Sequence, residues 1–328
     1  MQSKQHRFSL TNYALKNLIR LGGLQARLSI LIYHRVLSKP DPLSPGEDDT
    51  ETFDRQMSWL STCFKIIPLH EAVQKLRQGK LLPGTACITF DDGYADNAET
   101  ALPILQKYGI SATFFVSTGF LDGGRMWNDT IIELVRQARE PTLDLRKMGL
   151  GLFDINTVFK REQTISILLE KLKYLPLKSR ESKIGEMCTY SSAILPNDLM
   201  MTSKQVKLLH DAGMEIGGHT VNHPILACTE AVMAREEIGN GKEVLESIIR
   251  APVRAFAYPN GKPGQDYLSE HVQMVKELGF KAAVSTSYGA ARNSNDIYQL
   301  PRFSPWDQEK IRYILRMAQN MLKSTVTI

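Results

Sequence analysis

Short apolar segments alternate with segments of helical spacing along most of this 328-residue chain, and this alternation constrains its fold more than any other feature. The apolar segments are hydrophobic on both faces, as strands in a parallel sheet covered by helices are. We expect strands at residues 28–33, 64–67, 85–90, 112–116, 214–218, 253–258, 281–285 and 298–303. Strands in this βα order predict an α/β fold, a distorted barrel of seven or eight βα units that is closed or nearly closed.

Residues 120–200 interrupt the alternation and show mainly helical patterns. We interpret them as a helical insertion within one domain that spans residues 28–328. The preceding residues, 1–27, are expected to form an N-terminal helical segment, because apolar side chains within residues 9–21 share one face. That helix either packs on the domain or lies, as a basic amphipathic helix, on a membrane surface.

The composition excludes several classes of function. The net charge is +5 and no basic block is interleaved with aromatic residues, so we expect no nucleic-acid partner. No apolar run approaches the roughly 18 residues of a membrane span, and basic residues interrupt any secretory signal. The four cysteines form no C-x-x-C pair, which is typical of free thiols in a reducing compartment. We expect a cytoplasmic location, in solution or at the inner face of the membrane; no pattern specifies the oligomeric state.

Polar residues occur just past the ends of several expected strands. They are His34, Asp91, Asp92, Ser117, His219 and Pro259. The carboxyl ends of the strands in an α/β barrel form one rim, and the catalytic groups of such barrels lie on it. The sequence therefore predicts an active site that combines residues far apart in the chain.

Two of these strand ends carry potential metal ligands. TFDDG, residues 89–93, places two carboxylates side by side; a metal ion would offset their repulsion if one acid binds it, or one acid simply caps the next helix. In HTVNH, residues 219–223, two histidines four residues apart can meet one ion if the backbone makes a helical turn. Together the motifs favour a site of one carboxylate and two imidazoles, with positions open for water and substrate.

These motifs resemble those of a known family. TFDDG together with HTVNH is similar to the polysaccharide deacetylases that share the NodB homology domain, carbohydrate esterase family 4, and FAYPNG at 256–261 resembles the third motif of that family. The resemblance extends from about residue 28 to residue 305, apart from the insertion. The opening Tyr33-His34-Arg35 resembles the branch of the family found with exopolysaccharide and surface-glycan synthesis.

The resemblance implies a role for each matching residue. Asp92, His219 and His223 would bind zinc or another divalent transition metal, and Asp91 would be the general base for the attacking water. The backbone N–H of Tyr258 would stabilise the oxyanion. The implied substrate is an N-acetylated amino-sugar glycan, such as an exopolysaccharide, a capsule, an O-antigen or a lipid-linked precursor, and the products are acetate and a free amino sugar.

The sequence departs from the family pattern in two places. The last motif normally supplies a histidine as general acid, but the matching residues here are Leu300-Pro301-Arg302-Phe303. His34 is our candidate for the acid; alternatively, it hydrogen-bonds to a loop. The arginine of the third motif is also out of register, so Arg302 or Arg254 would orient Asp91 through an ion pair, and we favour Arg302.

Alternatives remain at two levels. Trp127, at the start of the insertion, either stacks on a sugar ring or anchors the inserted helices, and the same two interpretations apply to Trp306. For the whole chain, the missing histidine leaves room for a glycan-binding barrel with impaired catalysis. A related amidohydrolase that acts on a small cyclic amide is the third hypothesis, because fold and metal site can be reused.

Overall fold

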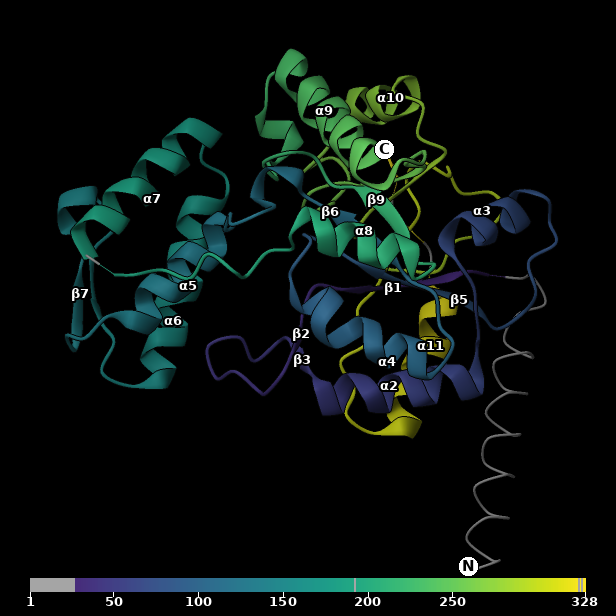
Figure 1. Ribbon diagram of the computed structural model, residues 1–328, viewed down its shortest axis with the longest axis horizontal. Coiled ribbons are helices and arrows are strands. Elements are labelled where there is room, and N and C mark those ends of the chain that lie inside the picture. The colour runs from purple at the N-terminus through teal and green to yellow at the C-terminus, as the bar shows by residue number, and fades with distance from the viewer. Residues whose placement is uncertain (1–26, 192, 324, 326) are drawn as a thin grey trace, which may run out of the picture.

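The computed structural model describes residues 27–191, 193–323, 325, 327 and 328. The expected N-terminal helix therefore lies outside the described residues. The centre of the structure is a parallel sheet (Figure 1). Its strands lie in the order β1 (Ser29–Tyr33), β5 (Thr85–Phe90), β6 (Thr113–Val116), β9 (Glu215–Gly218), β10 (Ala255–Ala257) and β11 (Ala282–Val284), with β4 (Lys65–Ile66) paired to the start of β5. All seven lie within segments expected to be strands.

The eighth expected strand, residues 298–303, forms isolated bridges instead of a strand. Leu300 exchanges hydrogen bonds of 2.8 and 2.9 Å with Ser285 and Ala283 at β11, and Phe303 exchanges two of 3.1 Å with β1. Pro301, which lies between them, has no N–H to donate and interrupts the ladder. The segment nevertheless joins the two edge strands, so the sheet closes into the distorted α/β barrel that the sequence predicts.

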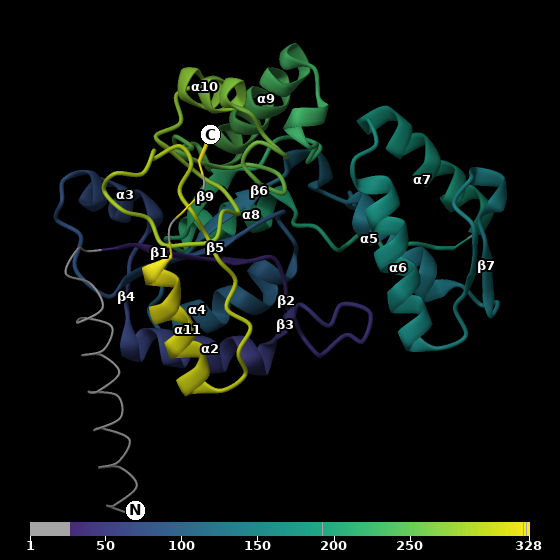
Figure 2. The ribbon, with the colours of Figure 1, turned by 180° about the vertical axis from the view of Figure 1, so that it is seen from behind.

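Helices cover the barrel in two groups (Figures 1 and 2). On one side α2 (Thr50–Cys63) packs against α4 (Leu102–Lys107) and α11 (Lys310–Leu322). On the other side α9 (Ala231–Ile249) packs between α8 (Ser203–Asp211) and α10 (Ser269–Glu277). Most of the largest buried hydrophobic cluster lies between the strands and these helices. None of the described helices combines the length and the hydropathy of a membrane span.

Helix α3 (Leu69–Arg77) covers the amino-terminal end of the barrel. Its apolar side chains Leu69 and Val73 join a second hydrophobic cluster together with strand residues such as Phe115 and Val284. The N–H of His70 donates to the carboxylate of Glu215, the first residue of β9 (3.2 Å). Helix α3 thus covers part of this end of the barrel, and the rim at the carboxyl ends of the strands is left for chemistry.

The interruption at residues 120–200 is a lobe beside the barrel (Figure 1). It contains α5 (Trp127–Gln137), the antiparallel strands β7 (Thr142–Asp144) and β8 (Leu152–Asp154), α6 (Val158–Lys173) and α7 (Leu177–Ser191). The sequence suggested helices only; the strand pair was not foreseen, because each strand is only three residues long. The lobe has its own hydrophobic cluster.

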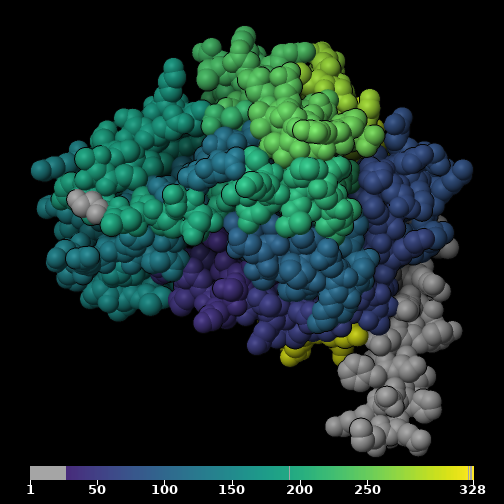
Figure 3. Space-filling view, viewed as in Figure 1, coloured from purple at the N-terminus to yellow at the C-terminus, as the bar shows by residue number. Residues whose placement is uncertain are grey.

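The loop between β2 (Val36–Leu37) and β3 (Asp48–Asp49) ties the lobe to the barrel. Leu43 of this loop belongs to the hydrophobic cluster of the lobe. Asp41 accepts a hydrogen bond of 3.0 Å from Arg136 of α5. Figure 3 shows the loop in purple between the lobe and the barrel. The lobe is therefore held at one side of the catalytic rim.

Candidate active site

Three potential metal ligands meet at the carboxyl ends of β5 and β9. The Oδ1 atom of Asp92 lies 3.3 Å from Nε2 of His219 and 3.3 Å from Nε2 of His223. Zinc–ligand bonds of about 2.0–2.1 Å would place neighbouring donor atoms of a tetrahedron about 3.3–3.4 Å apart. The spacing therefore fits a divalent transition metal. Among the described residues, no other group of His, Cys, Asp and Glu side chains gathers in this way.

The backbone at and beside the ligands is strained. Asp92, Thr220 and His223 all have positive φ, at 75°, 66° and 51°. This conformation is especially costly for threonine because its side chain is β-branched. Such strain persists only where the surrounding structure holds it.

Glu237 of α9 holds the loop of residues 219–223, which we name the histidine loop. Its carboxylate accepts hydrogen bonds from the N–H groups of Val221 (2.9 Å) and Asn222 (2.7 Å) and from the side-chain amide of Asn222 (2.7 Å). Gly119 and Gly241 allow close approach, because a Cβ atom at either would lie within 3.0 Å of an atom of this loop. The pattern of motifs gave no sign of Glu237, since it belongs to an ordinary amphipathic helix.

The two histidine rings are set for ligation in different ways. Nδ1 of His219 lies 2.7 Å from the carbonyl oxygen of Ala257, a contact that turns Nε2 towards Asp92. Nδ1 of His223 is buried and has no partner within the described structure. Burial lowers the pKa of His223 to about 3, although Asp92 opposes this shift. The ring is therefore neutral at physiological pH, the form that binds a metal.

Asp91 points to Arg302. Its two carboxylate oxygens lie 2.6 and 2.7 Å from the two terminal nitrogens of the guanidinium, and both residues are buried. Arg302 also donates to the hydroxyl of Thr89 and the carbonyl of Ser285, each at 3.1 Å. Burial acts to raise the pKa of Asp91, but Arg302, together with His219 and His34, outweighs it and the pKa is lowered. Asp91 is thus a carboxylate with a fixed orientation, in the contact that we favoured from the sequence.

Arg254, the alternative partner for Asp91, lies elsewhere. It lines a hollow near His70 and Glu215 at the amino-terminal end of the barrel. It precedes β10, whereas the catalytic rim lies beyond the carboxyl ends of the strands. Arg302, and not Arg254, therefore contacts Asp91 in the structure.

His34 lies in the same cleft as the three ligands and Asp91. Its backbone carbonyl accepts a hydrogen bond from Asn97 (2.8 Å). Burial acts to lower the pKa of His34, but the carboxylates of Asp92 and Glu47 and, more weakly, of Asp91 leave it raised. The position agrees with the proton donor expected from the sequence; the role itself stays a prediction.

Tyr258 does not occupy the position that the resemblance implied. Its N–H is directed at the carbonyl oxygen of Val284 (3.3 Å), and its hydroxyl donates to the carbonyl of Tyr298 (3.0 Å). The ring is fully buried and stacks on Tyr267. Tyr258 is not among the residues that line the cleft. The expectation that its N–H faces an oxyanion is therefore wrong for this arrangement, because neighbouring parallel strands use that N–H in their ladder.

The cleft has a volume of about 490 Å³ and lies between the barrel rim and the lobe. The lobe contributes one wall, made of Met126, Trp127, Asn128, Leu169, Glu170 and Lys173. The ring of Trp127 lines the cleft and also carries the guanidinium of Arg180 at 4.8 Å. Trp127 therefore contacts both the cleft and the lobe interior. Trp306 lies outside this lining, 60% exposed and stacked on Arg316.

A buried polar network beside the cleft was not foreseen. The hydroxyl of Tyr94, two residues after Asp92, lies 3.2 Å from Oδ1 of Asp129 and 3.4 Å from the side-chain amide of Asn128. The guanidinium of Arg35 covers the ring of Tyr94 at 4.6 Å. Burial raises the pKa of Asp129 to about 7, although Arg35 opposes it. The network connects the turn that carries Asp92 to the lobe.

The sequence profile of the polysaccharide deacetylase family matches this chain over residues 78–148 and 181–283. These two ranges include both metal-ligand motifs. The chain belongs to the polysaccharide deacetylase family. The gap in the match falls inside the inserted lobe. This deacetylase is 23% identical to YxkH of Bacillus subtilis over 280 residues, which are 84% of this chain and 71% of YxkH. It is 32% identical over 106 residues to the poly-beta-1,6-N-acetyl-D-glucosamine N-deacetylase of Staphylococcus aureus, a match that covers 32% of this chain and 35% of that protein.

Two solved structures share the fold of the deacetylase. The Streptococcus pyogenes deacetylase PplD superposes with a TM-score of 0.60 at 21% identity, over 90% of this chain and 99% of PplD. IcaB from Ammonifex degensii superposes with a TM-score of 0.58 at 20% identity, over 90% of this chain and 97% of IcaB. The predicted barrel and the predicted family are thus confirmed.

Proposed function

We propose that this polysaccharide deacetylase removes N-acetyl groups from an amino-sugar-containing glycan, and that Asp92, His219 and His223 bind a divalent transition metal for this reaction. The observation that carries the proposal is the convergence of these three side chains beside the Asp91–Arg302 ion pair. Support for the N-acetyl substrate comes from the match to the Staphylococcus aureus N-deacetylase over 106 residues. When bound, the ion would supply a Lewis acid that activates water and polarises the acetyl carbonyl.

The chain supplies the proton transfers. Asp91, kept ionised and oriented by Arg302, accepts a proton from the attacking water. The amine that leaves the sugar needs a proton, and His34 donates it, since it lies in the same cleft and no histidine occupies the last motif. Acetate and a free amino sugar result. Trp127 and Asn128, on the lobe wall, contact the sugar rings of the substrate.

Acetate release from N-acetylglucosamine oligomers tests the proposal. A chelator should abolish release, and added zinc or another divalent transition metal should restore it. His34→Ala should lower kcat while the bound metal remains. Acetate release that is unchanged by the chelator would contradict metal dependence. Binding of the oligomers without acetate release would contradict the proposal that they are deacetylated.

A further inference from the structure

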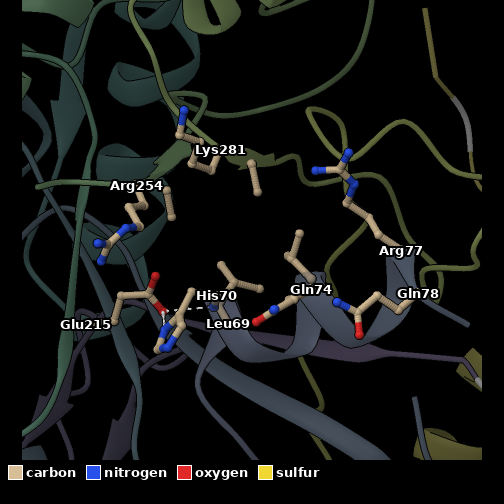
Figure 4. A pocket seen from close by; sticks show the side chains of 11 residues that line it. Leu69, His70, Gln74, Arg77, Gln78, Glu215, Arg254 and Lys281 are labelled. Atoms are coloured by element: carbon tan, nitrogen blue, oxygen red, sulfur yellow. Dashed lines mark hydrogen bonds and ion pairs between the residues drawn. The ribbon is translucent and has the colours of Figure 1, made fainter. Parts of the chain in front are cut away.

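A second hollow lies outside the active site, at the amino-terminal end of the barrel (Figure 4). It measures about 560 Å³, a size in the range of ligand sites. Its floor contains apolar side chains of α3 and of strands β10 and β11: Leu69, Val73, Ala255 and Ala282. A smaller hollow adjoins it and shares His70, Glu215 and Arg254.

Cationic side chains surround this floor. Arg77 and Arg254 stand on opposite sides of the hollow, and Lys281 lies at its edge (Figure 4). All three are exposed, and within the described part of the chain none forms a side-chain hydrogen bond or an ion pair. Glu215, the single acid in the lining, is engaged by His70 and by the hydroxyl of Thr113 (3.1 Å). The hollow thus combines an apolar floor with three cationic side chains against one carboxylate, a net positive charge.

The chain enters the barrel beside this hollow. Leu28, which precedes β1, belongs to the same hydrophobic cluster as Leu69, Val73, Ala255 and Ala282. The residues before it are strongly basic: the first 27 residues contain five lysines and arginines and no acid. The segment of sequence that leads into this end of the barrel is therefore basic in composition.

We propose that the amino-terminal end of the barrel docks on a membrane that contains anionic phospholipids, with Arg77, Arg254 and Lys281 contacting the phosphates and the apolar floor facing the interface. Basic groups beside apolar surface are what an anionic membrane surface attracts. The catalytic cleft lies at the carboxyl ends of the strands, so this orientation leaves it open to the aqueous side.

Co-sedimentation of the full chain with vesicles tests the docking surface. The chain should bind phosphatidylcholine vesicles that contain phosphatidylglycerol, and bind those of phosphatidylcholine alone weakly. Each cation near an anionic surface is worth roughly a fivefold change in partitioning. The triple variant Arg77→Gln, Arg254→Gln, Lys281→Gln should therefore bind about a hundredfold more weakly, with an unchanged thermal unfolding midpoint.

A second triple variant controls for net charge. Lys147→Gln, Lys178→Gln, Lys204→Gln removes the same charge from exposed positions on the lobe and on α8 and should retain most of the binding. An equal loss of vesicle binding in both triple variants, or no loss of binding in the first, would overturn the proposal. So would stabilisation of the chain by inorganic phosphate that depends on Arg77 and Arg254 without any vesicle binding, because the hollow would then be a site for small anions.

Discussion

Replacement of Arg302 by methionine removes the guanidinium that holds Asp91 and leaves a buried carboxylate without its partner. The pair has two charge-assisted contacts, of 2.6 and 2.7 Å, and its members are only 1% and 3% exposed. Breaking one side of a buried ion pair costs about 3–5 kcal/mol. We expect Arg302→Met to lose stability in this range near neutral pH.

The loss should depend on pH in a defined direction. In the wild type the pKa of Asp91 is below its unfolded value, so its contribution to stability is present above about pH 4 and is lost as the pH falls through the folded pKa. In Arg302→Met, the largest influence that lowers the pKa of Asp91 is removed; burial then acts against the weaker influences of His219 and His34, and the pKa of Asp91 rises relative to the wild type. The difference in stability between the two proteins should therefore grow as the pH rises from about 4.

Urea unfolding between pH 4 and pH 8 measures this difference, and acetate release over the same range should show the acidic limb of activity moved to higher pH. Arg254→Met is the matched control, because it makes the same substitution at an exposed arginine without a side-chain partner in the described structure. It should change stability by less than about 0.5 kcal/mol. Equal effects of the two substitutions, or a pH-independent loss in Arg302→Met, would refute the reasoning.

Three further predictions concern the supports of the site. Glu237→Ala should cost about 2–4 kcal/mol and reduce metal content, because three donors of the histidine loop lose their acceptor; Glu243→Ala, exposed on the same helix, should do neither. Gly119→Ala should lower the unfolding midpoint, since its Cβ would lie 2.6 Å from a side-chain oxygen of that loop, whereas Gly185→Ala meets open space in a helix and should raise it. Asp129 has a pKa of about 7 in the folded state, so it keeps a proton that the unfolded chain loses near pH 4. The free energy of unfolding of the wild type should therefore fall as the pH rises from 4 to 7. In urea unfolding, Asp129→Asn should reduce that fall by up to about 4 kcal/mol.

Much of the barrel could be predicted from the sequence because its strands are buried on both faces and appear as uninterrupted apolar segments. The segment 298–303 was expected to be a strand for the same reason, but Pro301 prevents a regular ladder and leaves two bridges. The strand pair of the lobe escaped prediction since strands of three residues have no measurable periodicity.

The ligand set could be proposed because each motif follows a strand, and strand ends meet at one rim. The contact of Arg302 with Asp91 could be favoured but not fixed, since two arginines were available. The supports Glu237, Tyr94 and Asp129 could not be found, because they act through tertiary contacts that no local sequence pattern reveals. Tyr258 was misplaced because a motif match does not show which N–H groups the strand ladder already uses.

The most direct test of the account separates the two adjacent carboxylates. Metal content and acetate release should be measured side by side for Asp91→Asn and Asp92→Asn. We predict that Asp91→Asn keeps about one metal ion per chain and loses acetate release, because it removes the base and leaves the ligands. Asp92→Asn should lose both. Full metal content in Asp92→Asn, or undiminished acetate release in Asp91→Asn, would contradict the assignment of ligand and base.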